Sequence, residues 1–240
     1  MNKEIYGLVL AGGRGKRLGI EFPKCAIDLG GKSIIERVIE NINKAGIKNI
    51  VCVLGYKKEI VEPLIPLDVK VCYQKDCLGT ADAVLASEEK FSGNRSDVLI
   101  MAGDMPFISE KTIKGAYQEY LKEKLDLIVC SFEKKDPFGY GRIIRKDSEI
   151  VDIKEERDCN SIEKEIKEVN ASVYIVDSEK LFHNIRKITN NNSQQEFYLT
   201  DVVSLFVKEG FKIGVYNIKD EKEMLGINKA EDLEKAKKYI

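Results

Sequence analysis

The sequence is poor in residues on which much enzyme chemistry depends. Its 240 residues include one histidine, His183, and no tryptophan. The histidine falls in a segment with the apolar spacing of an amphipathic helix, and we expect no active role for it. Nucleophilic catalysis by a Ser-His or Cys-His pair is therefore not expected.

The chain also lacks a surplus of charge of one sign. It carries 39 Lys and Arg against 40 Asp and Glu, which gives a formal net charge of −1. Because a nucleic-acid-binding protein is expected to show a basic surplus or a basic stripe, we expect no nucleic-acid partner. Any local cluster of cations is conspicuous against this neutral background.

Long apolar runs and paired cysteines are missing as well. Nothing approaches the roughly 20 apolar residues of a membrane span, and the apolar start is too short for a signal peptide. The six cysteines form no C-x-x-C pair, and several lie in apolar segments. We therefore expect buried, reduced thiols, no membrane partner and a soluble, cytoplasmic protein.

What the sequence does have is a glycine-rich, basic loop near its start. An apolar strand runs into residues 8–19 (LVLAGGRGKRLG), and FPK follows at 22–24. Glycines let a backbone wrap closely around a ligand and turn its N–H groups inward. The cations Arg14, Lys16 and Arg17 then face what the loop encloses. The pattern predicts a polyphosphate-binding loop; a glycine-rich turn with solvated charges is the alternative.

Two better-known phosphate loops do not fit this segment. The pattern G-x-x-x-x-G-K-[ST] needs glycine at position 10 and Ser or Thr at 17, where the chain has Leu10 and Arg17. The dinucleotide pattern G-x-G-x-x-G starting at Gly13 needs glycine at 18, where Leu18 stands.

Strand-like and helix-like segments alternate through the first half of the chain. This rhythm predicts an α/β fold with a doubly wound, mostly parallel, Rossmann-like sheet and a site beyond the strand carboxyl ends. A capping box at Ser33–Glu36 opens one helix, and Gly46 ends it. We expect strands at 5–10, 49–55, 69–74, 97–102 and 125–132, and further helices at 80–90 and 110–124.

The second half changes character and shows no linker or repeat. We expect one domain with a substrate-binding subregion inserted after about residue 137. The expected elements are a hairpin over 141–156 with its turn near 146–148, strands at 169–177 and 211–218, and helices near 179–188, 198–208 and 230–238.

Several motifs in a fixed order resemble one family. The loop at 8–19 with its FPK resembles the signature of sugar-phosphate nucleotidyltransferases. More narrowly, it is similar to the uridylyltransferase domain of bifunctional N-acetylglucosamine-1-phosphate uridylyltransferases. The similarity continues through QKDCLGTADA (74–83), GDMP (103–106), FGYGRI (138–143), EVNAS (168–172), NNNSQQEFYLTD (190–201) and GIN (226–228).

The resemblance implies that residues 1–240 form one domain whose two halves bind different substrates. Residues of about 1–137 form a nucleotide-binding half, and about 138–228 form a sugar-binding half that returns to a metal site. A helix near 230–238 closes the chain. In two-domain relatives an acetyl-transferring β-helix follows, whereas this sequence ends at Ile240. Acetyltransferase activity is therefore not expected, and the oligomeric state is left open.

The implied reaction joins UTP and N-acetylglucosamine-1-phosphate into UDP-N-acetylglucosamine and pyrophosphate, for cell-envelope glycan synthesis. The attacking phosphate oxygen is already an anion, so no general base is needed. Two anions must meet in line, however, which calls for cations, N–H donors and a divalent metal. By motif position, Arg17 and Lys24 match the catalytic cations, and Pro23 helps to aim Lys24.

Motif position also implies the binding residues. Asp104 and Asn228 match the ligands of Mg²⁺, the expected cofactor, although without the resemblance Asp104 would be interpreted first as a helix cap or turn residue. Nucleotide binding is implied for Leu10, Ala11, Gly12, Gly13, Gln74, Gly79 and Thr80, and sugar binding for Gly141, Glu155 and Asn170.

Four departures from the family pattern bear on substrate choice. Ser172 and Gln195 stand where glycine is usual, Asp82 where histidine is usual, and Ala102 where some relatives have an aromatic residue. Another sugar-1-phosphate or another nucleoside triphosphate is therefore the first alternative. A non-catalytic, nucleotide-binding regulatory module is the second.

Overall fold

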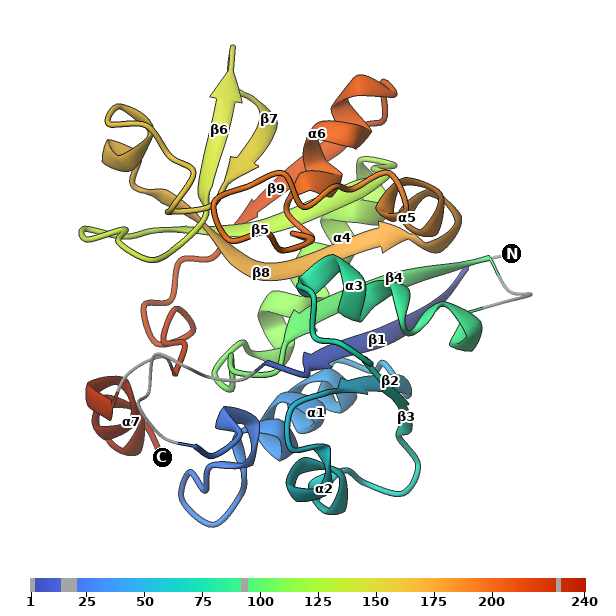
Figure 1. The fold of residues 1–240 in the computed structure, drawn as a ribbon, viewed down its shortest axis with the longest axis vertical. Helices are drawn as coiled ribbons and strands as arrows, with labels where there is room; N and C mark the ends of the chain where they lie inside the picture. The colour runs from blue at the N-terminus through green and yellow to red at the C-terminus, as the bar shows by residue number, and fades with distance from the viewer. Residues whose placement is uncertain (1–2, 14–20, 92–94, 228–229) are drawn as a thin grey trace.

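A computed structural model (Figure 1) describes residues 3–13, 21–91, 95–227 and 230–240. The strands are β1 (Glu4–Ala11), β2 (Asn49–Leu54), β3 (Lys70–Tyr73), β4 (Ser96–Ala102), β5 (Leu127–Glu133), β6 (Arg142–Lys146), β7 (Glu149–Lys154), β8 (Glu168–Asp177) and β9 (Ile213–Asn217). The α-helices are α1 (Ile34–Lys44), α2 (Lys58–Val61), α3 (Thr80–Leu85), α4 (Glu110–Lys122), α5 (Ser178–Ile185), α6 (Asp201–Lys208) and α7 (Ala230–Lys237).

Within the described residues the strands form one sheet in the order β3-β2-β1-β4-β8-β5-β9, with the β6–β7 hairpin attached to β8. The predicted α/β fold and strand positions are confirmed. Pairing is parallel between β1 and β2, β1 and β4, β2 and β3, and β5 and β9. The sequence did not predict that β8 runs antiparallel between β4 and β5. An apolar run indicates a buried strand but carries no information on its direction.

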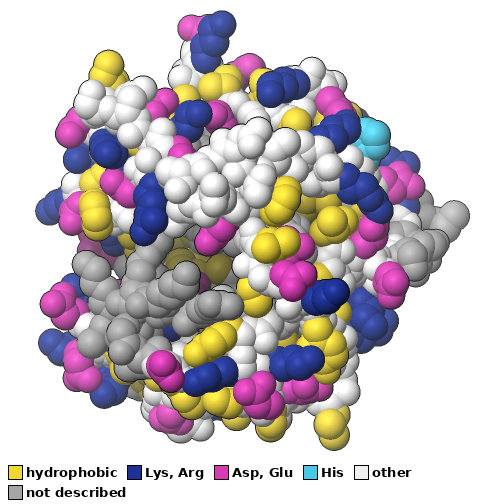
Figure 2. Space-filling view, viewed as in Figure 1, with side chains coloured by type: hydrophobic (Ala, Val, Ile, Leu, Met, Phe, Trp, Pro, Cys, Tyr) yellow, Lys and Arg dark blue, Asp and Glu magenta, His cyan; other side chains and the backbone are white. Residues whose placement is uncertain are grey.

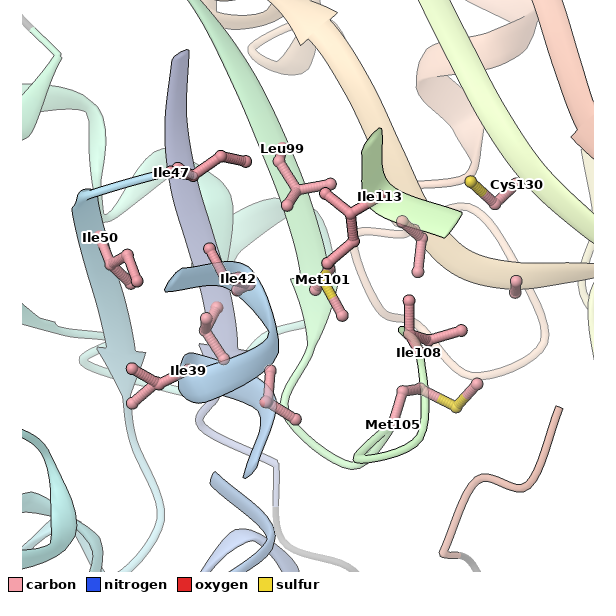
Figure 3. Packing of buried hydrophobic residues seen from close by; sticks show 14 of the residues in the cluster. Ile39, Ile42, Ile47, Ile50, Leu99, Met101, Met105, Ile108, Ile113 and Cys130 are labelled. Atoms are coloured by element: carbon pink, nitrogen blue, oxygen red, sulfur yellow. The ribbon is translucent and has the colours of Figure 1, made fainter. Parts of the chain in front are cut away.

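Two apolar layers cover the two faces of the sheet, because side chains alternate along each strand. On β1, Val9 and Ala11 join a core with residues of α1 and α4, and Tyr6 and Leu8 join a second core with residues of α3, α5 and α6. Figure 3 shows the first core, where Ile39 and Ile42 of α1 lie near the strands and Met101 lies toward Ile108. The result is a three-layer α/β/α arrangement.

The local signals behind α1 and the hairpin are confirmed. The Ser33 hydroxyl accepts a hydrogen bond from the Glu36 N–H at 3.3 Å, and the Glu36 carboxylate accepts one from the Ser33 N–H at 2.7 Å. Gly46 follows α1 with φ of 96°. Asp147 and Ser148 both have positive φ, as a two-residue type I′ hairpin turn requires.

Two helices are shorter than predicted, and polar side chains bond the backbone where each is cut short. The helix expected over 80–90 is α3 followed by a 3₁₀ turn at Glu88–Lys90, and between them the Ser87 hydroxyl donates to the Val84 carbonyl at 2.6 Å. The helix expected from 198 begins at Asp201, and the Leu199 N–H, just before it, donates to the Thr80 hydroxyl at 2.8 Å.

The end of the chain packs near its beginning. Leu29, Ile34, Ile227 and Ala236 form a small apolar cluster of their own, which attaches α7 to the start of α1. Figure 1 shows α7 beside the segment that leads into α1. The packing brings residue 227 close to the carboxyl end of β4. In the described part of the chain, no helix combines the length and apolar character needed to cross a membrane.

Candidate active site

The predicted residues Leu10 to Gly13, Lys24 and Asp104 lie at the carboxyl ends of β1 and β4, the edge at which ligands bind in open α/β sheets. The Gly103 N–H donates to the Leu10 carbonyl at 2.9 Å, which joins the two strand ends. The next turn is tight: a Cβ on Gly12 would lie 2.8 Å from Oε1 of Gln74 and 3.3 Å from the Gly55 nitrogen. In the space-filling view this side of the molecule is hollowed (Figure 2). Leu10, Ala11 and Gly12 thus line one edge, and Gly13 follows exposed.

Lys24 and Asp104 meet at this edge although 80 residues separate them. The Lys24 ammonium donates to Oδ2 of Asp104 at 2.8 Å and to the Ile227 carbonyl at 3.0 Å. Their side chains are 13% and 26% exposed, so the ion pair is sheltered but open to a ligand on one side. Pro23 precedes the 3₁₀ turn Lys24–Ala26 that carries the lysine.

The chain returns to this ion pair near its end, as the metal prediction requires. The Ile227 N–H donates to the Asp104 carbonyl at 3.2 Å, so residue 227 is fixed beside the carboxylate. Oδ2 of Asp104 and the Ile227 carbonyl both accept hydrogen bonds from the Lys24 ammonium. A carboxylate is the kind of hard oxygen ligand that Mg²⁺ prefers, so the Asp104 side chain fits the ion as one ligand. The predicted ligand Asn228 follows directly but lies outside the described residues, as do Arg14, Lys16 and the predicted catalytic Arg17.

Cys25 lies next to the ion pair but has no part in nucleophilic chemistry. Its sulfur lies 3.1 Å from where a Cβ on Gly103 would stand. Burial, and after it the Asp104 charge, raises the pKa of the Cys25 thiol to about 12. The thiol therefore stays protonated at neutral pH. All six cysteines are free, and all but the half-buried Cys77 are buried as expected.

Gln74 follows β3 and closes the nucleotide side. Its side-chain amide donates to the Gly79 carbonyl at 2.9 Å and to Oδ2 of Asp82 at 2.7 Å. Both hydrogens of the amide are thereby used within the loop, and the acceptor Oε1 is the remaining polar group. Asp82, one of the four departures, also accepts from the Leu78 N–H at 3.3 Å. This departure thus acts directly on the residue predicted to contact the base.

Gly79 must be glycine in this loop. Its φ is 139°, and a Cβ there would lie 2.4 Å from the Phe197 carbonyl oxygen. The Phe197 N–H donates to the Leu78 carbonyl at 2.9 Å, and the Ala81 N–H donates to the Phe197 carbonyl at 2.9 Å. Thr80 does not cap α3 with its side chain; its hydroxyl accepts from the Leu199 N–H instead.

The three residues predicted to bind sugar come together from three strands or strand ends. Gly141 precedes β6, Glu155 follows β7, and Asn170 lies on β8. The Asn170 N–H donates to the Gly141 carbonyl at 2.8 Å. A Cβ on Gly141 would lie 3.5 Å from Oε1 of Glu155 and 3.6 Å from Cβ of Asn170. A carboxylate and an amide thus surround a bare backbone position, an arrangement suited to hydroxyl and acetamido groups.

Sequence reasoning missed the segment that connects the two halves of the site, residues 197–200. Phe197 and Leu199 hold the Gly79–Thr80 turn, and the Thr200 hydroxyl donates to Oε1 of Glu155 at 3.2 Å. We call residues 197–200 the bridging segment. The motif at 190–201 marked this region, but its contacts are long-range and leave no local pattern to read.

Two departures at glycine positions keep a glycine-like backbone. Ser172 and Gln195 both have φ of 55°, in the left-handed region. This backbone conformation costs an L-residue roughly 1–2 kcal/mol.

We expect S172G and Q195G each to raise the free energy of unfolding by about 0.5–1 kcal/mol. This is the relieved strain minus the cost of the conformational entropy that glycine adds to the unfolded chain. Urea unfolding measures it. Ser87 has φ of −91°, so S87G is the matched control and should lose stability; equal effects at all three positions would contradict the strain argument.

Asp201 at the start of α6 predicts a pH effect on stability. Burial, followed by the nearby charges of Asp152 and Asp158 and opposed by Lys154, raises its pKa from 3.8 to about 6. Between pH 4 and 6 the folded chain keeps a proton that the unfolded chain releases, so stability falls as pH rises. D201N should therefore raise the free energy of unfolding by about 1–2 kcal/mol at pH 7, a figure already reduced because the carboxylate is partly exposed. At pH 4 the substitution should leave the free energy of unfolding almost unchanged. Thermal unfolding at both pH values measures this; an equal gain at both would contradict it.

Comparison with solved structures identifies the class of fold. UDP-glucose pyrophosphorylase complexed with UDP-glucose superposes with a TM-score of 0.82 at 20% sequence identity, and the match covers 98% of both chains. At this identity the likeness shows the fold alone, which is that of a nucleotidyltransferase.

Sequence comparison then identifies the family. Residues 7–196 match the MobA-like NTP transferase domain, and the chain belongs to that family. The bifunctional protein GlmU of Acholeplasma laidlawii is 39% identical over 236 residues, and that of Caldanaerobacter subterraneus subsp. tengcongensis is 38% identical over 239. These matches cover 98% and 99% of this chain but 51% and 52% of the relatives. The chain thus spans about half the length of these relatives, and the resemblance drawn from its motifs is confirmed.

Proposed function

We propose that this chain transfers a uridylyl group from UTP to N-acetylglucosamine-1-phosphate. The observation that carries the proposal is the meeting of Lys24, Asp104 and the Ile227 carbonyl at the carboxyl end of β4. In this proposal a triphosphate lies over the Gly12 turn, and the Lys24 ammonium and the Asp104 carboxylate serve its α- and β-phosphates. Family membership and the GlmU relatives support the same chemistry.

The proposed reaction is a direct displacement. A phosphate oxygen of the sugar-1-phosphate attacks the α-phosphorus of UTP, the new P–O bond forms, and the bond to the β-phosphate oxygen breaks to release pyrophosphate. Lys24 and Arg17 stabilise the charge that spreads over the phosphorus oxygens. Mg²⁺, held by Asp104 and Asn228, supplies further charge neutralisation when bound. No proton has to be removed, which agrees with the position of His183, exposed on α5 away from these groups.

Each substrate has its own set of residues in this proposal. The bare backbone of Leu10–Gly13 approaches the nucleotide, Gln74 meets the base with Oε1, and Gly79 and Thr80 close the base pocket. Gly141, Glu155 and Asn170 hold the sugar. The bridging segment keeps the two sets in register, so that the attacking oxygen meets the α-phosphorus in line.

Pyrophosphate release with Mg²⁺ tests the proposal across UTP, CTP, dTTP, GTP and ATP, each paired with several sugar-1-phosphates. Dominant turnover of UTP with N-acetylglucosamine-1-phosphate is the expected result. Turnover of another pair keeps the mechanism and moves attention to the departures Asp82, Ser172 and Gln195. Nucleotide binding without pyrophosphate release from any pair would instead support a regulatory module.

A further inference from the structure

An irregularity in β8 lies directly under the proposed sugar site. Asn170 pairs with Ser131 of β5 and Tyr174 pairs with Val129, so three residues of β8 oppose one residue of β5. Ser172 sits in the middle of this bulge with its left-handed φ of 55°. Bulges of this kind re-aim side chains next to functional sites. Here the re-aimed side chain is that of Asn170.

The bulge fixes which way the Asn170 amide points. Its Oδ1 accepts a hydrogen bond from the Ser172 backbone N–H at 3.0 Å. A backbone N–H can only donate, so the carbonyl end of the amide must face it. The Nδ2 end then donates to the Tyr174 hydroxyl at 2.6 Å. Among the residues that the structure describes, Nδ2 makes this one bond, so its second N–H is available to a ligand.

The Tyr174 hydroxyl is well suited to hold this orientation. Its side chain is 3% exposed and Asn170 is 6% exposed, so water does not compete for the bond. Burial, and after it the Glu155 charge, raises the pKa of the Tyr174 phenol. A neutral phenol oxygen beside a donating amide is a stable acceptor. Tyr174 itself belongs to the apolar core that includes residues of α3, α5 and α6.

We propose that Tyr174 is a positioning residue: it holds the Asn170 amide in the orientation that the Ser172 N–H selects, so that Asn170 presents an N–H donor to a sugar phosphate with an acceptor oxygen at that point. An acetamido carbonyl is such an acceptor. The inference rests on the proposed function, which places Asn170 against the sugar. It adds a residue that touches no substrate and acts only through the Asn170 amide.

The test is Tyr174→Phe, which removes only the hydroxyl. We expect KM for the preferred sugar-1-phosphate to rise about tenfold, the effect of one lost or misdirected hydrogen bond, while KM for UTP stays within twofold. Tyr120→Phe is the matched control, since its buried hydroxyl bonds Asp97 at 3.0 Å at the opposite end of β4. The control should lose comparable stability and keep both KM values.

A second variant separates positioning from a structural role. Asn170→Asp replaces the donor by an acceptor and should raise KM for the same sugar-1-phosphate. Adding Tyr174→Phe should then raise this KM little further, because both changes remove the same N–H donor. Additive losses, an unchanged sugar KM in Tyr174→Phe, or equal rises in both KM values would each overturn the inference.

The failure of the proposed function remains distinguishable from the failure of this inference. If the wild type prefers another sugar-1-phosphate, the proposed substrate is wrong, and the Tyr174 test runs unchanged on the preferred one. Calorimetric titration of the wild type with each sugar-1-phosphate accompanies the kinetics. Binding of none of them would overturn both.

Discussion

An Asp104→Asn variant is expected to fold normally and to lose a factor of about 10²–10³ in kcat, the size of loss seen when one preorganised charge contact is removed. The change keeps the shape of the side chain and removes its charge. Asp104 thereby becomes a poor Mg²⁺ ligand, and Lys24 loses the partner 2.8 Å away that aims it at the phosphates. Because the carboxylate is 26% exposed, stability should change by about 1 kcal/mol or less.

Pyrophosphate release over a range of Mg²⁺ concentrations measures this effect. The control is Asp68→Asn. Asp68 is an exposed carboxylate in the stretch between α2 and β3, and the variant should keep full activity. Lys24→Met should lower kcat by a similar factor, and the double variant should lose less than the product of the two single losses. Near-full turnover by Asp104→Asn would remove Asp104 from the mechanism.

Arg142→Met is expected to destabilise the fold by about 3 kcal/mol, because the change breaks a largely buried ion pair and leaves the Glu156 carboxylate, 17% exposed, without its partner. Arg142 is 1% exposed, and its guanidinium donates to the Glu156 carboxylate at 2.6 Å and to the Tyr140 carbonyl. Glu156 in turn accepts from the Gly139 N–H at 3.2 Å. One buried cation therefore holds the turn that leads into Gly141.

Urea unfolding with its m-value measures this prediction. The control is Arg145→Met, three residues further along β6, whose two hydrogen bonds to Glu168 are partly solvated at 35% exposure of the arginine. It should cost about 1 kcal/mol or less. R142M/E156Q should recover part of the loss, because the unpaired carboxylate is gone. Equal losses for Arg142→Met and Arg145→Met would show that burial of the charge does not govern the effect.

The fold was largely predictable from the sequence because its signals are local. Apolar runs such as 97–102 and the capping box at Ser33 depend on neighbouring residues, and the structure matches them closely. The antiparallel direction of β8 was not predictable, because burial on both faces produces the same apolar run in either direction. Just after the early end of α3 the Ser87 hydroxyl donates to the Val84 carbonyl, a bond that the spacing of apolar residues does not reveal.

The candidate site was predictable only as a set of residue types. The motifs predicted Lys24, Asp104 and Gln74 as site residues, and in the structure each lies at the expected edge of the sheet. Their partners were not predictable from local sequence. The Ile227 carbonyl and the bridging segment act through contacts across tens to hundreds of residues, and a carbonyl group has no residue type by which a sequence could reveal it. The Tyr174 hydroxyl contacts Asn170 only four residues away, beside a bulge in β8 that an apolar run does not reveal.

The bridging segment has a consequence for anyone who sets out to change what this protein accepts. One short stretch supports the turn at Gly79 through Phe197 and the carboxylate of Glu155 through Thr200. A loop exchange that redirects the choice of base will therefore also shift the support of the sugar pocket. A redesign therefore has to exchange residues 79–80, 155 and 197–200 together or leave all of them unchanged.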